Sequence, residues 1–185
     1  MKKIAVFFVV LLFATAFVNA QNTAVISYSV AMTASGWGPF VSSAEQAGQP
    51  GQRRQAEALR VRINQTDIPG TVRFRVHAGG SWSEWKYNND VAGVIGQNKP
   101  IEAIQVELTG DLDDRYDVQY MVFQNNAWTP WVANGVDAGV FGQRRFVEAV
   151  QIILTENKAG RRPAGGRRAP PPPPPPPPAG GGGRR

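Results

Sequence analysis

The segment Thr71–Leu108, TVRFRVHAGGSWSEWKYNNDVAGVIGQNKPIEAIQVEL, holds one complete copy of a pattern that occurs three times in this 185-residue chain. In each copy a Trp is followed eleven residues later by the Gly of an Ala-Gly pair, three residues after that by a second Gly, and twenty residues after the Trp by Glu-Ala. A register kept over periods of 45 and 46 residues predicts three similar supersecondary units that share a core. The repeated residues are Trp37, Trp82 and Trp128; Gly48, Gly93 and Gly139; Gly51, Gly96 and Gly142; and Glu57, Glu102 and Glu148.

The second copy gives the clearest secondary-structure pattern. Apolar Val72, Phe74 and Val76 alternate with polar neighbours, which is typical of a half-buried strand. The Gly79-Gly80 pair is typical of a hairpin turn. We therefore predict a strand at 71–77, a turn at 78–81, a strand at 82–87, a compact irregular segment at 88–100 and a strand at 101–108.

Copies one and three follow the same plan, and Tyr28, Phe74 and Tyr120 fall at the same point of the first strand. Helical periodicity is not persuasive anywhere, and the 20 glycines would interrupt helices. A single unit buries too little to be stable and leaves its sheet edges exposed, so the three units should close together. We predict an all-β, pseudo-threefold β-prism, with a β-trefoil as the alternative, and repeats at about 24–63, 70–108 and 116–154.

Residues 1–20 are typical of a secretory signal peptide, with Lys2 and Lys3 ahead of an apolar run and small residues before Gln21. No later stretch approaches the ~20 apolar residues that a membrane-spanning helix needs. The chain has no cysteine, which excludes disulfides, thiolate metal sites and a lipoprotein anchor. We expect a bacterial protein that is secreted to the periplasm or the cell exterior.

Positive charge is concentrated at the C-terminus. The predicted repeat domain, 21–157, has 11 Lys+Arg against 14 Asp+Glu, whereas the tail, 158–185, has seven Lys+Arg and no acid. The tail has no apolar surface to bury, so we expect it to be disordered around a polyproline II rod formed by 170–178. We favour a charged spacer; alternatively, the arginine pairs bind anionic envelope polymer or nucleic acid.

The repeated motif resembles the clostridial hydrophobic W (ChW) family over residues 25–154, in three copies. In the first copy it comprises Gly36-Trp37, Ala47-Gly48, Gly51 and Glu57-Ala58, followed by an alternating apolar strand. The residue before the Trp is Gly in that copy alone, and the basic tail is not part of the repeat. The resemblance implies a secreted protein that binds surface glycans or other proteins and does not catalyse a reaction.

Each repeated Trp has an aromatic partner three residues later: Phe40, Trp85 and Trp131. In a strand, residues three apart point to opposite faces. We expect Trp37, Trp82 and Trp128 to fill the shared core, and the partners to face outward as platforms on which sugar rings stack.

The repeated glutamates and glycines have a structural and a functional interpretation. We favour Glu57, Glu102 and Glu148 as acceptors of backbone N–H bonds that fix loops; alternatively, they bind ligand hydroxyls. The repeated glycines should serve left-handed turns or close backbone contacts. Basic residues also recur before the third strand, at Arg54, Lys99 and Arg145. They are solvated loop residues or part of a site for acidic polysaccharide.

Catalysis and metal binding have little support in the sequence. His77 is the single histidine, no cysteine can join it, and no seryl nucleophile motif is present. The four aspartates within 111–117 lack the glycine and glutamate of an EF-hand loop, so we expect a polar surface turn and no metal. No cofactor is expected.

We expect a secreted, non-enzymatic module that binds carbohydrate or cell-envelope polysaccharide through three weak, equivalent sites. The alternative is a structural or adhesion protein that binds another surface protein, with the tail as a tether.

Overall fold

Each repeat folds into a hairpin of two long antiparallel strands. The computed structural model describes residues 23–64 and 66–157, so the predicted signal peptide and basic tail lie outside the described residues. The long strands are β1 (Val25–Met32) with β5 (Ala56–Asn64), β6 (Gly70–Ala78) with β10 (Ile101–Gly110), and β11 (Tyr116–Gln124) with β14 (Val147–Glu156). The alternation of apolar and polar residues that predicted these strands matches their burial, with the apolar side chains turned inward.

Short strands flank each long pair. The repeated Trp and the residues around it form two-residue strands that pair with the first long strand of the same repeat. These strands are β2 (Gly36–Trp37), β3 (Val41–Ser42), β7 (Ser81–Trp82), β8 (Lys86–Tyr87), β12 (Ala127–Trp128) and β13 (Val132–Ala133). The predicted single strand at 82–87 is therefore wrong in its middle, because residues 83–85 leave the sheet.

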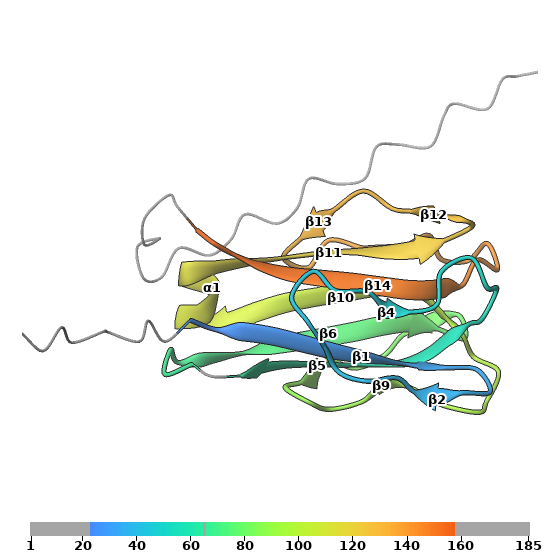
Figure 1. Cartoon of the computed structure of the whole chain (residues 1–185), viewed down its shortest axis with the longest axis horizontal. Helices are drawn as coiled ribbons and strands as arrows, with labels where there is room; N and C mark the ends of the chain where they lie inside the picture. The colour runs from blue at the N-terminus through green and yellow to red at the C-terminus, as the bar shows by residue number, and fades with distance from the viewer. Residues whose placement is uncertain (1–22, 65, 158–185) are drawn as a thin grey trace, which may run out of the picture.

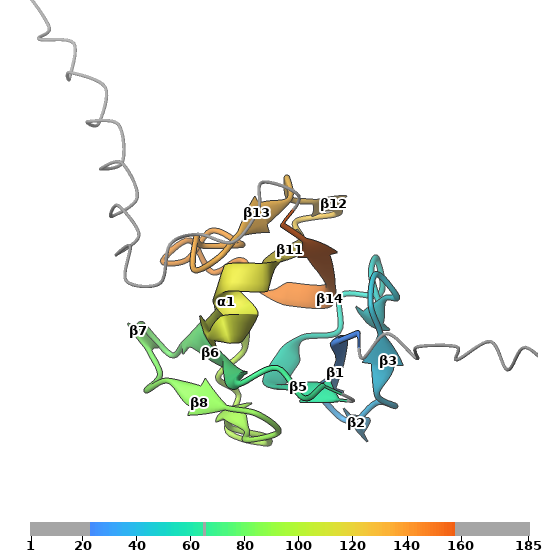
Figure 2. The same ribbon diagram turned by 90° about the vertical axis from the view of Figure 1, so that its left-hand side faces the viewer.

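The three sheets stand around a common axis. In Figure 1 the long strands run side by side along the molecule, and in Figure 2, seen from the end, the sheets surround a shared centre with the short strands outside. The described residues form three separate antiparallel sheets and no closed barrel. This arrangement agrees with the predicted prism-like, pseudo-threefold body and not with the trefoil alternative.

The repeats are joined in a cycle, because the Ala-Gly pair of each repeat adds to the sheet of another. β4 (Ala47–Gly48) of the first repeat pairs with β14 of the third, and β9 (Ala92–Gly93) of the second pairs with β5 of the first. Ala138 of the third repeat completes the cycle by an isolated bridge to Ile104 in β10. The second long strand of each repeat (β5, β10 or β14) thus pairs with a neighbouring repeat, which protects a sheet edge that would otherwise be exposed.

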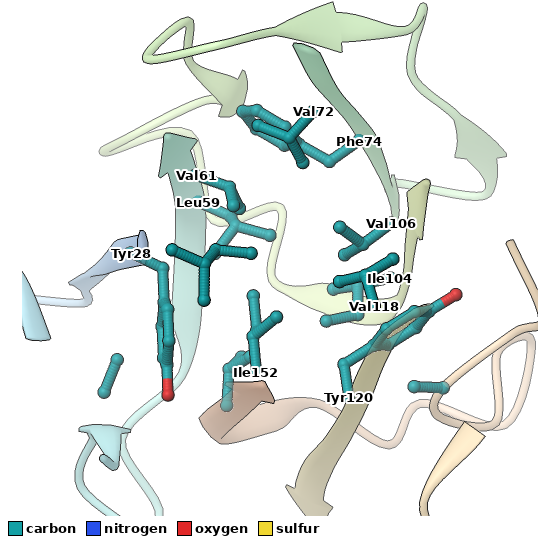
Figure 3. Packing of buried hydrophobic residues seen from close by; sticks show 14 of the residues in the cluster. Tyr28, Leu59, Val61, Val72, Phe74, Ile104, Val106, Val118, Tyr120 and Ile152 are labelled. Carbon is teal, nitrogen blue, oxygen red and sulfur yellow. The ribbon is translucent and has the colours of Figure 1, made fainter. Parts of the chain in front are cut away.

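One core lies at the centre and draws on all three repeats. Tyr28, Phe74 and Tyr120, at equivalent positions, are all fully buried, and branched residues of the last strands pack among them (Figure 3). The Tyr28 hydroxyl donates a hydrogen bond to the Glu45 carbonyl, which satisfies its polar atom. Full burial of such side chains contributes roughly 1.5–3 kcal/mol each.

The aspartate-rich segment between the second and third repeats forms a short helix, α1 (Asp111–Arg115), instead of the predicted turn. Leu112 anchors it: its side chain is fully buried and its N–H donates to the Pro69 carbonyl. In the described part of the chain no helix has the length and apolar character needed to cross a membrane. Nor do His77 and the carboxylates of the described residues gather into a set that could hold a metal ion.

Candidate functional site

The three repeated tryptophans lie on the outer faces of the sheets and not in the core, which corrects the sequence-based expectation. They are partly exposed and are absent from the central apolar cluster. Register explains this placement. The tryptophans lie directly across from residues whose side chains point away from the axis, and opposed residues share one face of a sheet. The pairs are Ala31 with Trp37, His77 with Trp82, and Phe123 with Trp128.

The aromatic partners lie on the same side as the tryptophans, so the predicted division between core and surface is also wrong. The Arg75 guanidinium carbon is 5.1 Å from the centre of the Trp82 ring and 4.6 Å from that of Trp85. Period-two alternation does not apply between these two rings, because the strand ends at Trp82. The partner in the third repeat, Trp131, is 44% exposed.

Arginines stack on the aromatic rings of the first two sheets. The Arg60 guanidinium lies 4.1 Å from the centre of the Trp37 ring, and that of Arg62 lies 3.9 Å from Phe40. Contacts of this kind contribute about 0.5–1 kcal/mol at exposed sites. These arginines were not among the binding residues predicted from the sequence. The signal that could have found them is their spacing, because Arg60-Val61-Arg62 places both cations on the outward face of one strand.

The three outer faces carry different chemistry at equivalent cross-strand pairs. The first sheet sets serines opposite arginines, the second sets arginines opposite polar or acidic acceptors, and the third has mostly amide and apolar side chains. The pairs are Ser29–Arg60 and Ser27–Arg62 in the first sheet, Arg75–Gln105 and Arg73–Glu107 in the second, and Met121–Gln151 and Gln119–Ile153 in the third.

In the second sheet the arginines are bound by their cross-strand neighbours. Arg73 forms an ion pair with Glu107 at 2.5 Å, and Arg75 Nε donates to Gln105 Oε1 at 2.7 Å. In the third sheet no described arginine lies over Trp128 or Trp131. Arg115 lies 5.7 Å from the centre of the Tyr116 ring at the start of β11, and Trp128 meets Phe123 edge to face at 5.5 Å. The same backbone frame therefore presents one aromatic surface whose arginines have no described carboxylate partner, one whose arginines are bound by Glu107 and Gln105, and one with no described arginine over its tryptophans.

The repeated glutamates hold the loops between repeats. Their Oε2 atoms accept backbone N–H bonds from the loop of the repeat that adds its Ala-Gly pair, at 3.0–3.2 Å. Carboxylates engaged in this way fix backbone and are poorly placed to take up ligand hydroxyls. The pairs are Glu57 with Gly96, Glu102 with Gly142, and Glu148 with Arg53.

The glycines of the Ala-Gly pairs are required because the backbone of the neighbouring repeat passes too close to them to leave room for a Cβ. Gly93 has φ of +97°, and a Cβ there would lie 2.2 Å from the Glu57 carbonyl oxygen. Gly48 and Gly139 show the same conformation and similar contacts. In contrast, Gly96, like Gly51 and Gly142, has a positive φ but open space around it, so only its turn geometry favours glycine.

The predicted loop bases do not join the aromatic faces. Arg54, Lys99 and Arg145 are exposed, and none of them lies over an aromatic ring among the described residues. Lys99 packs its side chain near Gly79 and lines a groove. The Arg145 carbonyl accepts a bond from Gln124, which helps to position the loop.

Two equivalent grooves lie beside the Ala-Gly loops. The first, of about 260 Å³, is lined by Trp37, Pro39 and Gly48 among others. The second, of about 370 Å³, is lined by Lys86, Lys99 and residues around Gly93. Both are large enough for a small polar group.

Comparison with known proteins gives one family. A sequence model of the family described as Clostridial hydrophobic W (ChW) matches residues 79–110. Neither the curated proteins nor the solved structures gave a match. The matched residues run from the hairpin turn of the second repeat to the end of β10, and so include the repeated Trp82, Gly93 and Glu102.

Proposed function

We propose that this chain is a secreted, non-catalytic module that binds carbohydrate or cell-envelope polysaccharide on the outer aromatic faces of its sheets. The observation that supports this most is Trp131. It occupies the outward position that Phe40 and Trp85 hold in the other repeats, it is 44% exposed, and no described arginine lies over its ring. A bare indole offers a flat apolar surface for a sugar ring, while its N–H remains available to a hydroxyl.

The proposal includes a family assignment for the whole repeat domain. We propose that the first and third repeats are ChW units like the matched second one, because their Trp, Gly and Glu residues occupy equivalent places in the cycle of sheets. Three faces on one body support multivalent binding, in which weak contacts add through effective concentration. The predicted signal peptide and basic tail accord with export and with attachment to an anionic surface.

A protein partner is the second candidate. It is favoured by the exposed apolar residues of the Ala-Gly loops: Val94, Ile95, Val140 and Phe141. Exposed apolar side chains that gather in loops are typical of protein interaction sites. In this case the tail would tether an adhesion module.

Glycan arrays and pull-down with envelope polysaccharide distinguish carbohydrate binding from protein binding. Trp131→Ala in the full mature chain should lower neutral glycan affinity by about 5- to 150-fold, as a lost stacking contact of about 1–3 kcal/mol implies. Trp85→Ala is the matched comparison and should lose less affinity than Trp131→Ala, since the Trp85 indole is already engaged by Arg73 and Arg75. Glycan binding that survives Trp131→Ala unchanged would overturn the stacking platform and favour the protein partner.

A further inference from the structure

We propose that the outer face of the first sheet is a binding site for an anionic group of the polymer, held by Arg60 and Arg62. This inference rests on the proposed polysaccharide binding and names its chemical class, a polymer that carries closely spaced carboxylate or sulfate groups. Neither arginine belongs to the predicted set of ligand-binding residues, and they lie on a different sheet from Trp131.

The two guanidinium groups are held in place before any ligand arrives. Arg60 lies over Trp37 and Arg62 over Phe40, at 4.1 and 3.9 Å from the ring centres. The N–H donors of a guanidinium lie in its own plane, so stacking on a ring leaves them free to bind an oxyanion. A side chain already restrained by stacking also loses less conformational entropy on binding.

Neither arginine is neutralised within the described residues. No described carboxylate lies within 4.0 Å of either guanidinium, and the residues opposite them are serines. The hydrogen bond that Arg62 makes is a long one of 3.4 Å, from Nε to Ser27 Oγ. Arg60 Nε has no hydrogen-bond partner in the described part of the chain but is buried, so an anion from solvent would bind the terminal Nη atoms of this guanidinium. Two unpaired cations side by side attract an anion from outside.

The second sheet is an internal comparison. It also carries arginines over aromatic rings, but on its first long strand, β6, and there Glu107 binds Arg73 and Gln105 binds Arg75. The donors that are free on the first face are thus occupied on the second. The two sheets differ in the strand that carries the arginines, β5 in the first and β6 in the second, and in the residues opposite them, which are serines in the first sheet and Glu107 and Gln105 in the second.

Spacing favours a polymer over a single small anion. Arg60 and Arg62 are two residues apart on one strand, so their Cα atoms are about 6.6 Å apart at 3.3 Å per residue. One oxyanion can bind each guanidinium in a bidentate manner, and adjacent acidic groups of one chain can occupy both.

The test measures affinity of the full mature chain for polygalacturonate, dextran sulfate and neutral dextran. We expect Arg60→Gln/Arg62→Gln to lose at least about tenfold affinity for an acidic polymer, as two charge-assisted hydrogen bonds imply, with neutral glycan binding unchanged. The more affected polymer identifies carboxylate or sulfate as the preferred group. Arg75→Gln is the control, since it removes one positive charge and keeps the basic tail. It should alter affinity less than about twofold, because Arg75 is already hydrogen-bonded to Gln105.

If Arg60→Gln and Arg75→Gln lose equal affinity for the acidic polymers, the proposed site is overturned, because the loss would then reflect only the reduced net charge of the protein. The variant Arg60→Lys/Arg62→Lys keeps charge but loses the planar fork, so full affinity in this variant would also contradict the proposal. Thermal unfolding checks the fold, and single Arg62→Gln replaces the double variant if that unfolds. A third outcome separates this inference from the proposed function. If Trp131→Ala loses affinity for neutral glycan while Arg60→Gln/Arg62→Gln keeps full affinity for the acidic polymers, this inference is rejected and the proposed function stands.

Discussion

The carboxylate of Glu57 in the first repeat accepts a hydrogen bond of 3.0 Å from the backbone N–H of Gly96 in the second. The corresponding bonds in the other repeats give a cycle in which each repeat fixes the loop of another. Backbone bonds reinforce the cycle a few residues earlier in each repeat, from Asn89 to Val61 at 2.8 Å for example. We therefore expect the three repeats to unfold together, because the loop of each repeat is held by hydrogen bonds to another repeat.

Glu57→Ala should destabilise the protein by about 1–3 kcal/mol, since Glu57 is buried and the Gly96 N–H would lose its acceptor. Urea unfolding followed by tryptophan fluorescence measures the change. Glu57→Gln keeps an acceptor oxygen and should lose less. Exposed Glu84→Ala is the control and should stay within about 0.5 kcal/mol of wild type. Equal stability of the two alanine variants would refute the loop-fixing role.

Gly93→Ala and Gly96→Ala separate close approach from turn geometry. Both glycines have positive φ, so both variants incur left-handed strain of roughly 1–2 kcal/mol. Only at Gly93 would the new Cβ also meet a backbone oxygen, at 2.2 Å. Gly93→Ala should therefore lower the thermal midpoint clearly further than Gly96→Ala. The opposite order would show that the junction at Gly93 is free to move.

Tyr28 makes stability depend on pH in the alkaline range. Burial raises the pKa of Tyr28 to about 12 from an ordinary value of 10. Above pH 10 the unfolded state therefore loses this proton while the folded state keeps it, so stability falls as pH rises from 10 toward 12, by at most about 1.4 kcal/mol per pH unit. Tyr28→Phe should make this decline less steep when stability is measured by denaturant unfolding across that range. The remaining decline comes from Tyr120, because burial also raises the pKa of that side chain.

The fold should tolerate Tyr28→Phe, because Phe74 occupies the equivalent position in the second repeat and is also fully buried. At pH 7 the cost should be about 1 kcal/mol for the hydrogen bond to the Glu45 carbonyl. A decline as steep in Tyr28→Phe as in wild type would contradict the assignment to Tyr28.

The spacing of the repeats predicted the fold because residues at equivalent positions of the repeats take equivalent places in the structure. Tyr28, Phe74 and Tyr120 hold the same position in the three repeats and meet in one core. The side on which the tryptophans lie could not be read in this way. A fixed period says that three residues are equivalent, not whether they face the axis or solvent. Their placement depends on two-residue strands, which are too short to show alternation.

The differences between the three faces were present in the sequence but depended on pairing. Arg60 and Arg73 look alike as strand arginines, and only the cross-strand register shows that one faces Ser29 and the other Glu107. Long-range pairing of this kind is set by the hydrophobic pattern of whole strands and by turn geometry. The equivalence of the repeats was thus predictable, whereas their divergence in charge required the structure.

Trp131 should dominate the quenchable fluorescence of the protein. It is exposed, whereas the other four tryptophans, Trp37, Trp82, Trp85 and Trp128, are only partly exposed, and arginines cover three of these. Trp131→Phe should remove most of the emission that acrylamide quenches, and Trp85→Phe should leave that emission in place. A sugar ring stacked on Trp131 would shield it, so a saturating glycan should reduce quenching in wild type and in Trp85→Phe but not in Trp131→Phe. Shielding that persists in Trp131→Phe would move the binding site to another face.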